Sequence, residues 1–454
     1  MDQVLSGEVD FTEPLDLLVV GAELIEPAGK LFGHYDIGVR SGVIAEIAQR
    51  ITRPARVVLD ARGYLLTPGL VDLHTHIFAG AGYWSIDAPS VAWRTGTTTW
   101  IDAGSAGAYS FGAFRRVAVE GSPLRVRALL HISALGLIAN AGEARDIDLC
   151  DPGLCAEVIE QHRDVIVGVK CRLSEVAAGD HGLELLRRSI AAGEKAGVPV
   201  MVHIGNGSLG IDAVLEMLRP GDIVTHCTTA GDMTLVTGDR KIRPSALSAR
   251  ERGVLFDVGH GSGAFSFDVV ETCAEHGFWP DTISSDLHQK SILGPAFDLP
   301  TCLSKLVAVG MPLREAIAAT TTRPAAALGL SGLGRIELGG PADLALFELR
   351  EGTFDLFDTG LRSRTADRLL VNRATFVGGR ELEEVQAAAP APWVRTTPNQ
   401  AEVLKSTGRP RLPWAMTLNR VDDFVPLDLK PNCSGLDSGL RSTGGAGQLR
   451  GKGI

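Results

Sequence analysis

The chain has 454 residues, of which 45% are hydrophobic and 22% charged, and it carries a formal net charge of −10 at pH 7. Such a chain can bury a large core, and its negative charge argues against nucleic acid or an anionic membrane as a partner. The start, MDQVLSGEVDFTEP, has no apolar signal segment, and no long apolar run predicts a membrane span. Seven cysteines without a paired C-x-x-C favour a reducing cytoplasm. We expect a cytoplasmic protein that acts on a small molecule, as a monomer or a homo-oligomer.

Both ends of the chain show a strand-like pattern. Alternating apolar residues with glycine-bearing turns run through residues 15–69, and the pattern returns after residue 334 in GRIELGGPADLALFELR. The simplest arrangement is a small β-sandwich built from residues 1–69 and 335–395, with residues 70–334 inserted between them. Residues 396–454 have little periodicity and become rich in glycine, which predicts a flexible or disordered tail.

The inserted segment alternates short apolar runs with longer stretches of helical period, such as DHGLELLRRSIAAGEKAG. Strand followed by helix, repeated eight times, predicts an α/β fold of the (β/α)8 TIM barrel type. Strands that are apolar throughout suit a parallel sheet that is buried on both faces. The expected strands are residues 71–77, 97–103, 126–133, 165–171, 198–204, 222–227, 254–260 and 282–287.

Residues that can bind metal fall at the C-terminal ends of these strands, where barrel enzymes gather their chemistry. The first two are histidines in VDLHTHIFAG, two residues apart, so on a strand their side chains point to the same face. Imidazole and carboxylate both suit zinc, and the whole set predicts a site for two divalent cations. The set consists of His74 and His76 on the first strand, Lys170 on the fourth, His203 on the fifth, His226 on the sixth and Asp286 on the eighth.

Each residue alone has a simpler explanation. A strand histidine can be a core residue, and Asp286 can cap a helix. Lys170 lies in the apolar run VIVGVKC, where burial disfavours its charge. It could form a buried ion pair with Asp286, or its neutral amine could react with carbon dioxide to give a carbamate that bridges two metals. The joint placement of the set favours the metal site.

The order H-x-H, Lys, His, His, Asp along an eightfold α/β pattern resembles the binuclear metal branch of the amidohydrolase superfamily. TPGLVDLHTH and GGPADLALFE are similar to the segments that flank the barrel in that superfamily. VGVKCRLS, GDIVTHC, ERGVLFDVGHGSGAFSFD and PDTISSDLH resemble its acetyl-(R)-mandelate deacetylase-like subgroup, whose members are often labelled dihydroorotase or D-aminoacylase-like. The resemblance covers residues 15–385.

The resemblance implies a role for each residue of the set. One metal would be held by the two H-x-H histidines with Asp286, the other by His203 and His226, and carboxylated Lys170 and a hydroxide would bridge the two ions. The hydroxide would attack an ester or amide carbonyl, and Asp286 would carry its proton to the leaving group. After THC the chain reads TTAGDMTLVTGD in place of the subgroup's Asn-Gly turn, so the pocket can differ while the metals stay.

Two further residues are candidate substrate contacts. Arg172 lies two residues past Lys170, so on a strand it shares the same face and offers a planar fork for a substrate carboxylate. The alternative for Arg172 is an ion pair with a neighbouring acid such as Glu175. His260, at the end of the seventh expected strand, is the second candidate contact.

We therefore expect a binuclear metallohydrolase, a deacetylase of N-acyl amino acids or O-acyl hydroxy acids. The first alternative is a cyclic amide hydrolase like dihydroorotase, which would place a cationic residue just past H-x-H, where this chain has Phe78. A mononuclear deaminase would not need Lys170. A metal-free scaffold on the same barrel would be expected to have lost ligands, and none of the set is missing.

Overall fold

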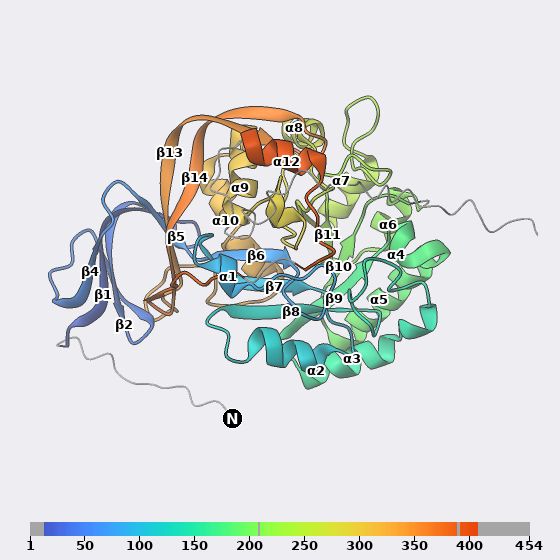
Figure 1. The fold of residues 1–454 in the computed structure, drawn as a ribbon, viewed down its shortest axis with the longest axis horizontal. Helices are drawn as coiled ribbons and strands as arrows, with labels where there is room; N and C mark the ends of the chain where they lie inside the picture. Colours follow the sequence, from blue (N-terminus) through green and yellow to red (C-terminus); the bar gives the residue numbers. More distant parts are fainter. Residues whose placement is uncertain (1–12, 208, 388–390, 407–454) are drawn as a thin grey trace, which may run out of the picture. The chain divides into compact units, whose positions relative to one another are not determined.

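The computed structural model describes residues 13–207, 209–387 and 391–406, which form two sheets and a set of helices (Figure 1). The first sheet draws its strands from both ends of the chain, and the second is parallel and carries the middle of the chain. Within the described residues, no helix combines the length and the apolar character needed to cross a membrane.

The first sheet has the strand order β15-β14-β13-β5-β1-β2-β3, with β4 paired to β1. β1, β2 and β3 pair antiparallel as the alternating pattern predicts, whereas β4 and β5 run parallel to β1. β5 also pairs with β13, so strands far apart in sequence lie side by side (Figure 1). The strands are β1 (Leu15–Glu26), β2 (Leu31–Arg40), β3 (Val43–Ala48), β4 (Ala55–Asp60), β5 (Leu65–Pro68), β13 (Leu344–Phe357), β14 (Ser363–Val377) and β15 (Arg380–Glu381).

The second sheet is parallel throughout, in the order β12-β11-β10-β9-β8-β7-β6. Its first two strands are buried along their whole length, as expected for a sheet covered on both faces. The described strands match seven of the eight expected segments. They are β6 (Leu70–Thr75), β7 (Thr97–Ala103), β8 (Arg125–His131), β9 (Ile166–Arg172), β10 (Val200–His203), β11 (Ile223–Thr225) and β12 (Leu255–Asp257).

The eighth expected segment, residues 282–287, lies between the two edges of the parallel sheet. It forms one parallel bridge to β12, Asp257 with Thr282, and one to β6, Thr75 with Leu287. Backbone N–H groups of His76 and Val258 donate to the carbonyls of Leu287 and Thr282, respectively. The sheet is therefore curled in the manner of a TIM-barrel-type α/β fold, and the segment that carries Asp286 lies next to the strand that carries His74.

The helices follow local capping rules. α3 starts after Asp151, whose carboxylate accepts from two backbone N–H groups of the first turn, and α5 ends at Gly197 with φ +66°. In α5 the apolar side packs inward and the arginines stay outside. The helices are α1 (Pro89–Ala92), α2 (Phe111–Phe114), α3 (Pro152–Gln161), α4 (Glu175–Ala178), α5 (Gly182–Ala196), α6 (Ile211–Met217), α7 (Pro244–Glu251), α8 (Phe267–Glu275), α9 (Leu299–Ala308), α10 (Leu313–Ala319), α11 (Thr322–Ala327) and α12 (Pro398–Ser406).

The two chain ends meet in one hydrogen-bonded sheet. The described strands from both ends are joined because β5 pairs with β1 and with β13. The start of the predicted flexible tail is the helix α12, in which the amide of Gln400 donates to the carbonyls of Lys290 and Gly294. The rest of the predicted tail, residues 407–454, lies outside the described residues.

Candidate active site

A cavity of about 300 Å³ opens at the C-terminal ends of the parallel strands. Its lining includes every one of the predicted metal ligands, which therefore converge on one place although they are spread over more than 200 residues of sequence. The wall also includes aromatic and apolar side chains, two from loops and one from α4: Trp84, Leu137 and Val176.

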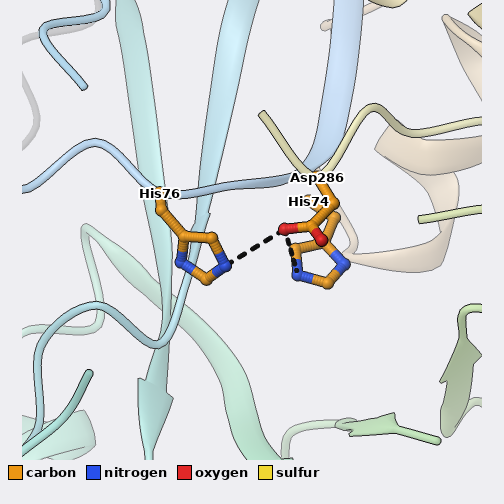
Figure 2. A group of neighbouring side chains, drawn as sticks. All are labelled: His74, His76 and Asp286. Atoms are coloured by element: carbon orange, nitrogen blue, oxygen red, sulfur yellow. Dashed lines mark ion pairs between the residues drawn. The ribbon is translucent and has the colours of Figure 1, made fainter. Parts of the chain in front are cut away.

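His74, His76 and Asp286 form the tightest group in the cavity (Figure 2). One ligand atom of each lies within 4.8 Å of the others. Asp286 Oδ1 is 3.4 Å from His74 Nε2 and 3.2 Å from His76 Nε2. The same oxygen is buried and has no hydrogen-bond partner within the described residues. The three atoms face a common point, which is the arrangement that a cation would satisfy.

The proton positions on the rings support that conclusion. The Thr225 hydroxyl donates to Asp257 Oδ2 at 2.7 Å, so it accepts from His74 Nδ1, 2.8 Å away. His226 Nδ1 donates to the carbonyl of Gly259 at 2.6 Å. In both rings the proton is held on Nδ1, so Nε2 carries the lone pair that could bind a metal. This outer hydrogen bonding is what metal-binding histidines normally have.

The second pair of histidines lies beside the first. His226 Nε2 is 2.7 Å from His203 Nδ1, and the rings of His74 and His226 are 5.1 Å apart. Burial lowers the pKa of His74, His76 and His203 well below the usual value and that of His226 to about 4. The imidazoles are therefore neutral at pH 7, the form that binds metals. The donor set as a whole fits divalent ions such as zinc.

Lys170 is fully buried between these two groups. Its Nζ is 3.0 Å from His74 Nε2 and 3.4 Å from Met201 Sδ. Burial lowers its pKa to about 7, although the charge of Asp286 acts in the opposite direction. Among the described ion pairs none joins Lys170 to Asp286, so the simple ion-pair explanation is not the one that the structure shows. Gly104, with φ +86°, makes the space: a Cβ there would lie 2.8 Å from Lys170 Cγ.

Arg172 lines the same cavity, as its position two residues past Lys170 predicts. Its Nη1 lies 3.2 Å from Glu143 Oε1, and Glu143 comes from the loop after β8. The alternative that we gave for Arg172, an ion pair with a neighbouring acid such as Glu175, is met in another form, because the described ion pair joins Arg172 to Glu143. Arg172 Nε has no hydrogen-bond partner within the described residues.

His260, the second predicted substrate contact, has other partners in the structure. His260 is fully buried and is not part of the cavity lining. Its Nδ1 bonds to the carbonyl of Gly261 at 2.9 Å, its Nε2 to Lys305 Nζ at 2.7 Å, and its ring stacks on Phe265. Both ring nitrogens are therefore engaged on the outer side of the strand end.

Sequence reasoning missed His288, which lines the cavity two residues after Asp286, and the buried Glu143. The spacing of His288 from Asp286 is the same i, i+2 signal that singled out His76, and it is present in PDTISSDLH. Nothing in the sequence connects Glu143 to Arg172, because the two lie on different segments.

Comparisons with known proteins agree with this geometry. Residues 65–397 match the family model described as "Amidohydrolase family". A deacetylase of Brucella anthropi is 35% identical over 346 residues, covering 76% of this chain and 86% of that protein. Two crystal structures are similar to this protein, and each match covers about four-fifths of this chain and nearly all of the other chain. A dihydroorotase superposes with TM-score 0.74 and 32% identity (80% and 98% covered), and an adenine deaminase with TM-score 0.76 and 29% identity (81% and 99%).

Proposed function

The chain belongs to the amidohydrolase family and is a hydrolase of amide or ester bonds, and we propose that it deacylates a small N-acyl amino acid or O-acyl hydroxy acid. The observation that carries the proposal is the convergence of four neutral histidines, a buried lysine and Asp286 on one cavity. The name of the Brucella anthropi relative supports the choice of an acyl group as the part that is removed.

The donor set indicates which residues would hold metal. His74, His76 and Asp286 would bind one divalent ion, His203 and His226 a second, and Lys170 would be shared between them. Bound zinc ions would polarise a carbonyl and lower the pKa of water. For Lys170 to be shared, its neutral amine attacks the carbon of carbon dioxide, an N–C bond forms, and one proton leaves to solvent. The product is a carbamate, which offers two oxygen atoms as metal ligands where the amine offers one nitrogen.

Asp286 is placed to move protons. We assign it the proton that an attacking water loses, which it would pass to the leaving nitrogen or oxygen as the acyl bond breaks and the bonding electron pair stays with that atom. Oδ1 lies beside the Nε2 atoms of His74 and His76, whereas Oδ2 lies 4.0 Å from His288 Nε2. Oδ1 could therefore bind the metal while Oδ2 accepts and releases the proton.

Arg172 would bind a carboxylate of the substrate. Its guanidinium reaches the cavity while its Nη1 forms an ion pair with Glu143. We expect Arg172→Met to lower kcat/KM for an acid far more than for its neutral methyl ester, because only the acid loses a charged partner. Equal losses for both substrates would make Arg172 structural.

Hydrolysis of a cyclic amide is the second candidate, supported by the similarity to the dihydroorotase structure. The residue just past H-x-H argues against it. Phe78 is buried against Phe114, with ring centroids 5.4 Å apart, and does not line the cavity. No cation is available at that position to hold a substrate carboxylate.

The test is a screen of N-acyl amino acids and O-acyl hydroxy acids, both enantiomers, with dihydroorotate as the competitor, on zinc-reconstituted protein. We expect two metal ions per chain and hydrolysis of at least one acyl compound. Asp286→Asn should retain the fold and lose about 10²–10⁴-fold in turnover. Lys170→Ala should lose metal and recover activity with a short carboxylic acid. If the protein binds about one metal ion per chain and Lys170→Ala leaves that number unchanged, Lys170 does not bridge two metals.

The domain arrangement is a further part of the proposal. We propose that residues 70–334 are a catalytic (β/α)8 barrel inserted in a β-sandwich domain made from residues 1–69 and 335–395. The pairing of β5 with β13 supports a single unit built from both chain ends.

A further inference from the structure

His288 lies in the cavity wall with no role in the chemistry described so far. It is buried, it follows Asp286 by two residues, and its ring packs against the edge of Trp84 with centroids 4.9 Å apart. Its ring centroid is 6.3 Å from that of His76. The side chain therefore stands in the cavity wall near His76 and Asp286.

Backbone groups fix the orientation of this ring. His288 Nδ1 accepts from the N–H of Lys290 at 3.1 Å and from the N–H of Ser291 at 3.3 Å. An accepting nitrogen carries a lone pair, so the proton of the neutral ring is on Nε2. Turning the ring over would break both bonds, and the loop itself is tied by the Ser291 hydroxyl, which donates to the carbonyl of Asp286 at 2.8 Å. Nε2–H is thus a preorganised donor.

The donor lies near Oδ2, the second carboxylate oxygen of Asp286. His288 Nε2 is 4.0 Å from Asp286 Oδ2, too far for a direct hydrogen bond. An atom placed about 2.9 Å from both would form two hydrogen bonds at roughly a right angle. Such an atom accepts from His288 and exchanges a proton with Asp286. A leaving nitrogen or oxygen has this combination of properties.

We propose that His288 is a catalytic residue that donates a hydrogen bond from Nε2–H to the leaving atom of the substrate. The inference rests on the proposed function, in which Asp286 protonates the same atom. As the bond from the acyl carbon breaks, its electron pair collects on the leaving atom. His288 keeps its proton throughout and stabilises that charge, while the transferred proton comes from Asp286.

The test is the dependence of the rate on the acidity of the leaving group. We compare kcat/KM for a series of esters that share one acyl group and differ in the alcohol, from a nitrophenol to an alkyl alcohol. His288→Leu removes the donor, and His288→Gln provides a side-chain N–H at a similar reach. We expect His288→Leu to lose about 10²-fold with the alkyl ester and little with the nitrophenyl ester, and His288→Gln to recover most of the loss.

Two measurements separate this role from a structural one. The affinity of the enzyme for the product hydroxy acid, measured by calorimetry, should fall in His288→Leu and recover in His288→Gln. The metal content and the thermal unfolding temperature of both variants should equal those of the unsubstituted protein. A loss of equal size across the series, or no loss, overturns the role of His288. If the unsubstituted enzyme hydrolyses no acyl compound at all, the proposed function fails first, and the inference falls with it.

Discussion

Arg172→Met should destabilise the protein strongly, apart from any effect on substrate. The Glu143 side chain is 1% exposed and that of Arg172 is 11% exposed. Neither Glu143 oxygen has a hydrogen-bond partner within the described residues, and His131 Nε2 lies 3.8 Å from Oε1. Arg172 is therefore the group that stabilises the charge of this buried carboxylate. Removing one partner of a buried pair costs about 3–5 kcal/mol.

Removing both partners should cost much less, because no charge is then left buried and unpaired. We expect Arg172→Met with Glu143→Leu to lie within about 1–2 kcal/mol of the unsubstituted protein, as found for buried pairs replaced by apolar residues. The matched control is Arg335→Met, which breaks an exposed pair with Glu337 (41% and 48% exposed) and should change the free energy of unfolding by less than about 1 kcal/mol.

The assay is urea unfolding of the metal-free protein, followed by far-ultraviolet circular dichroism. If Arg172→Met lowers the free energy of unfolding by less than about 1 kcal/mol, the reasoning is refuted, because even an exposed ion pair can contribute that much. A double variant as unstable as the single one would refute it equally. The double variant then also serves as the stable background in which acid and ester substrates are compared.

Two further predictions concern backbone space and pH. Gly261→Ala should lower turnover, because at φ +54° its Cβ would lie 2.4 Å from Asp286 Oδ2. Gly277→Ala, at φ +66° with open space around it, should carry the same backbone strain of about 1 kcal/mol and keep full turnover, and a matching loss in both would refute the steric account. The metal-free protein should gain stability as the pH rises from about 7 towards 10.5. Folding lowers the pKa of Lys170 from 10.5 to about 7, so in this pH range the unfolded chain binds a proton at Lys170 that the folded chain does not bind. The slope, at most about 1.4 kcal/mol per pH unit, should flatten in Lys170→Met when unfolding is measured across this range.

The strands of the parallel sheet and the convergence of the predicted ligands on one cavity could be read from the sequence. Apolar runs of fixed length mark β6 and β7, and side chains at strand ends must meet once such strands are arranged in parallel. The eighth segment was harder to place, because residues 282–287 make isolated bridges rather than a strand. The single sheet built from both chain ends and the helix at the start of the predicted tail were not visible either, since both depend on contacts between distant segments.

The pairing of Arg172 could not be predicted because it is a tertiary contact. Periodicity correctly places Arg172 beside Lys170, since both belong to β9. It says nothing of a loop acid such as Glu143, whose position depends on how residues after β8 fold back. The partners of His260 could not be predicted either, because they depend on a turn with positive φ at Gly259 and Gly261 and on Lys305 of a distant helix.

The backbone strain of the molecule indicates why these strand ends carry the chemistry. His226 and Asp286 have φ of +69° and +45°, a region that costs a residue with a side chain about 1–2 kcal/mol. Each is held there by its neighbours: His226 Nδ1 donates to the carbonyl of Gly259, and the carbonyl of Asp286 accepts from the Ser291 hydroxyl. A Cβ at Gly259 would lie 2.9 Å from that same His226 nitrogen, so glycine is needed for the close approach. The surrounding fold thus offsets local strain at a predicted metal ligand and at the proposed proton carrier, and in both cases the strained turn directs the side chain into the cavity.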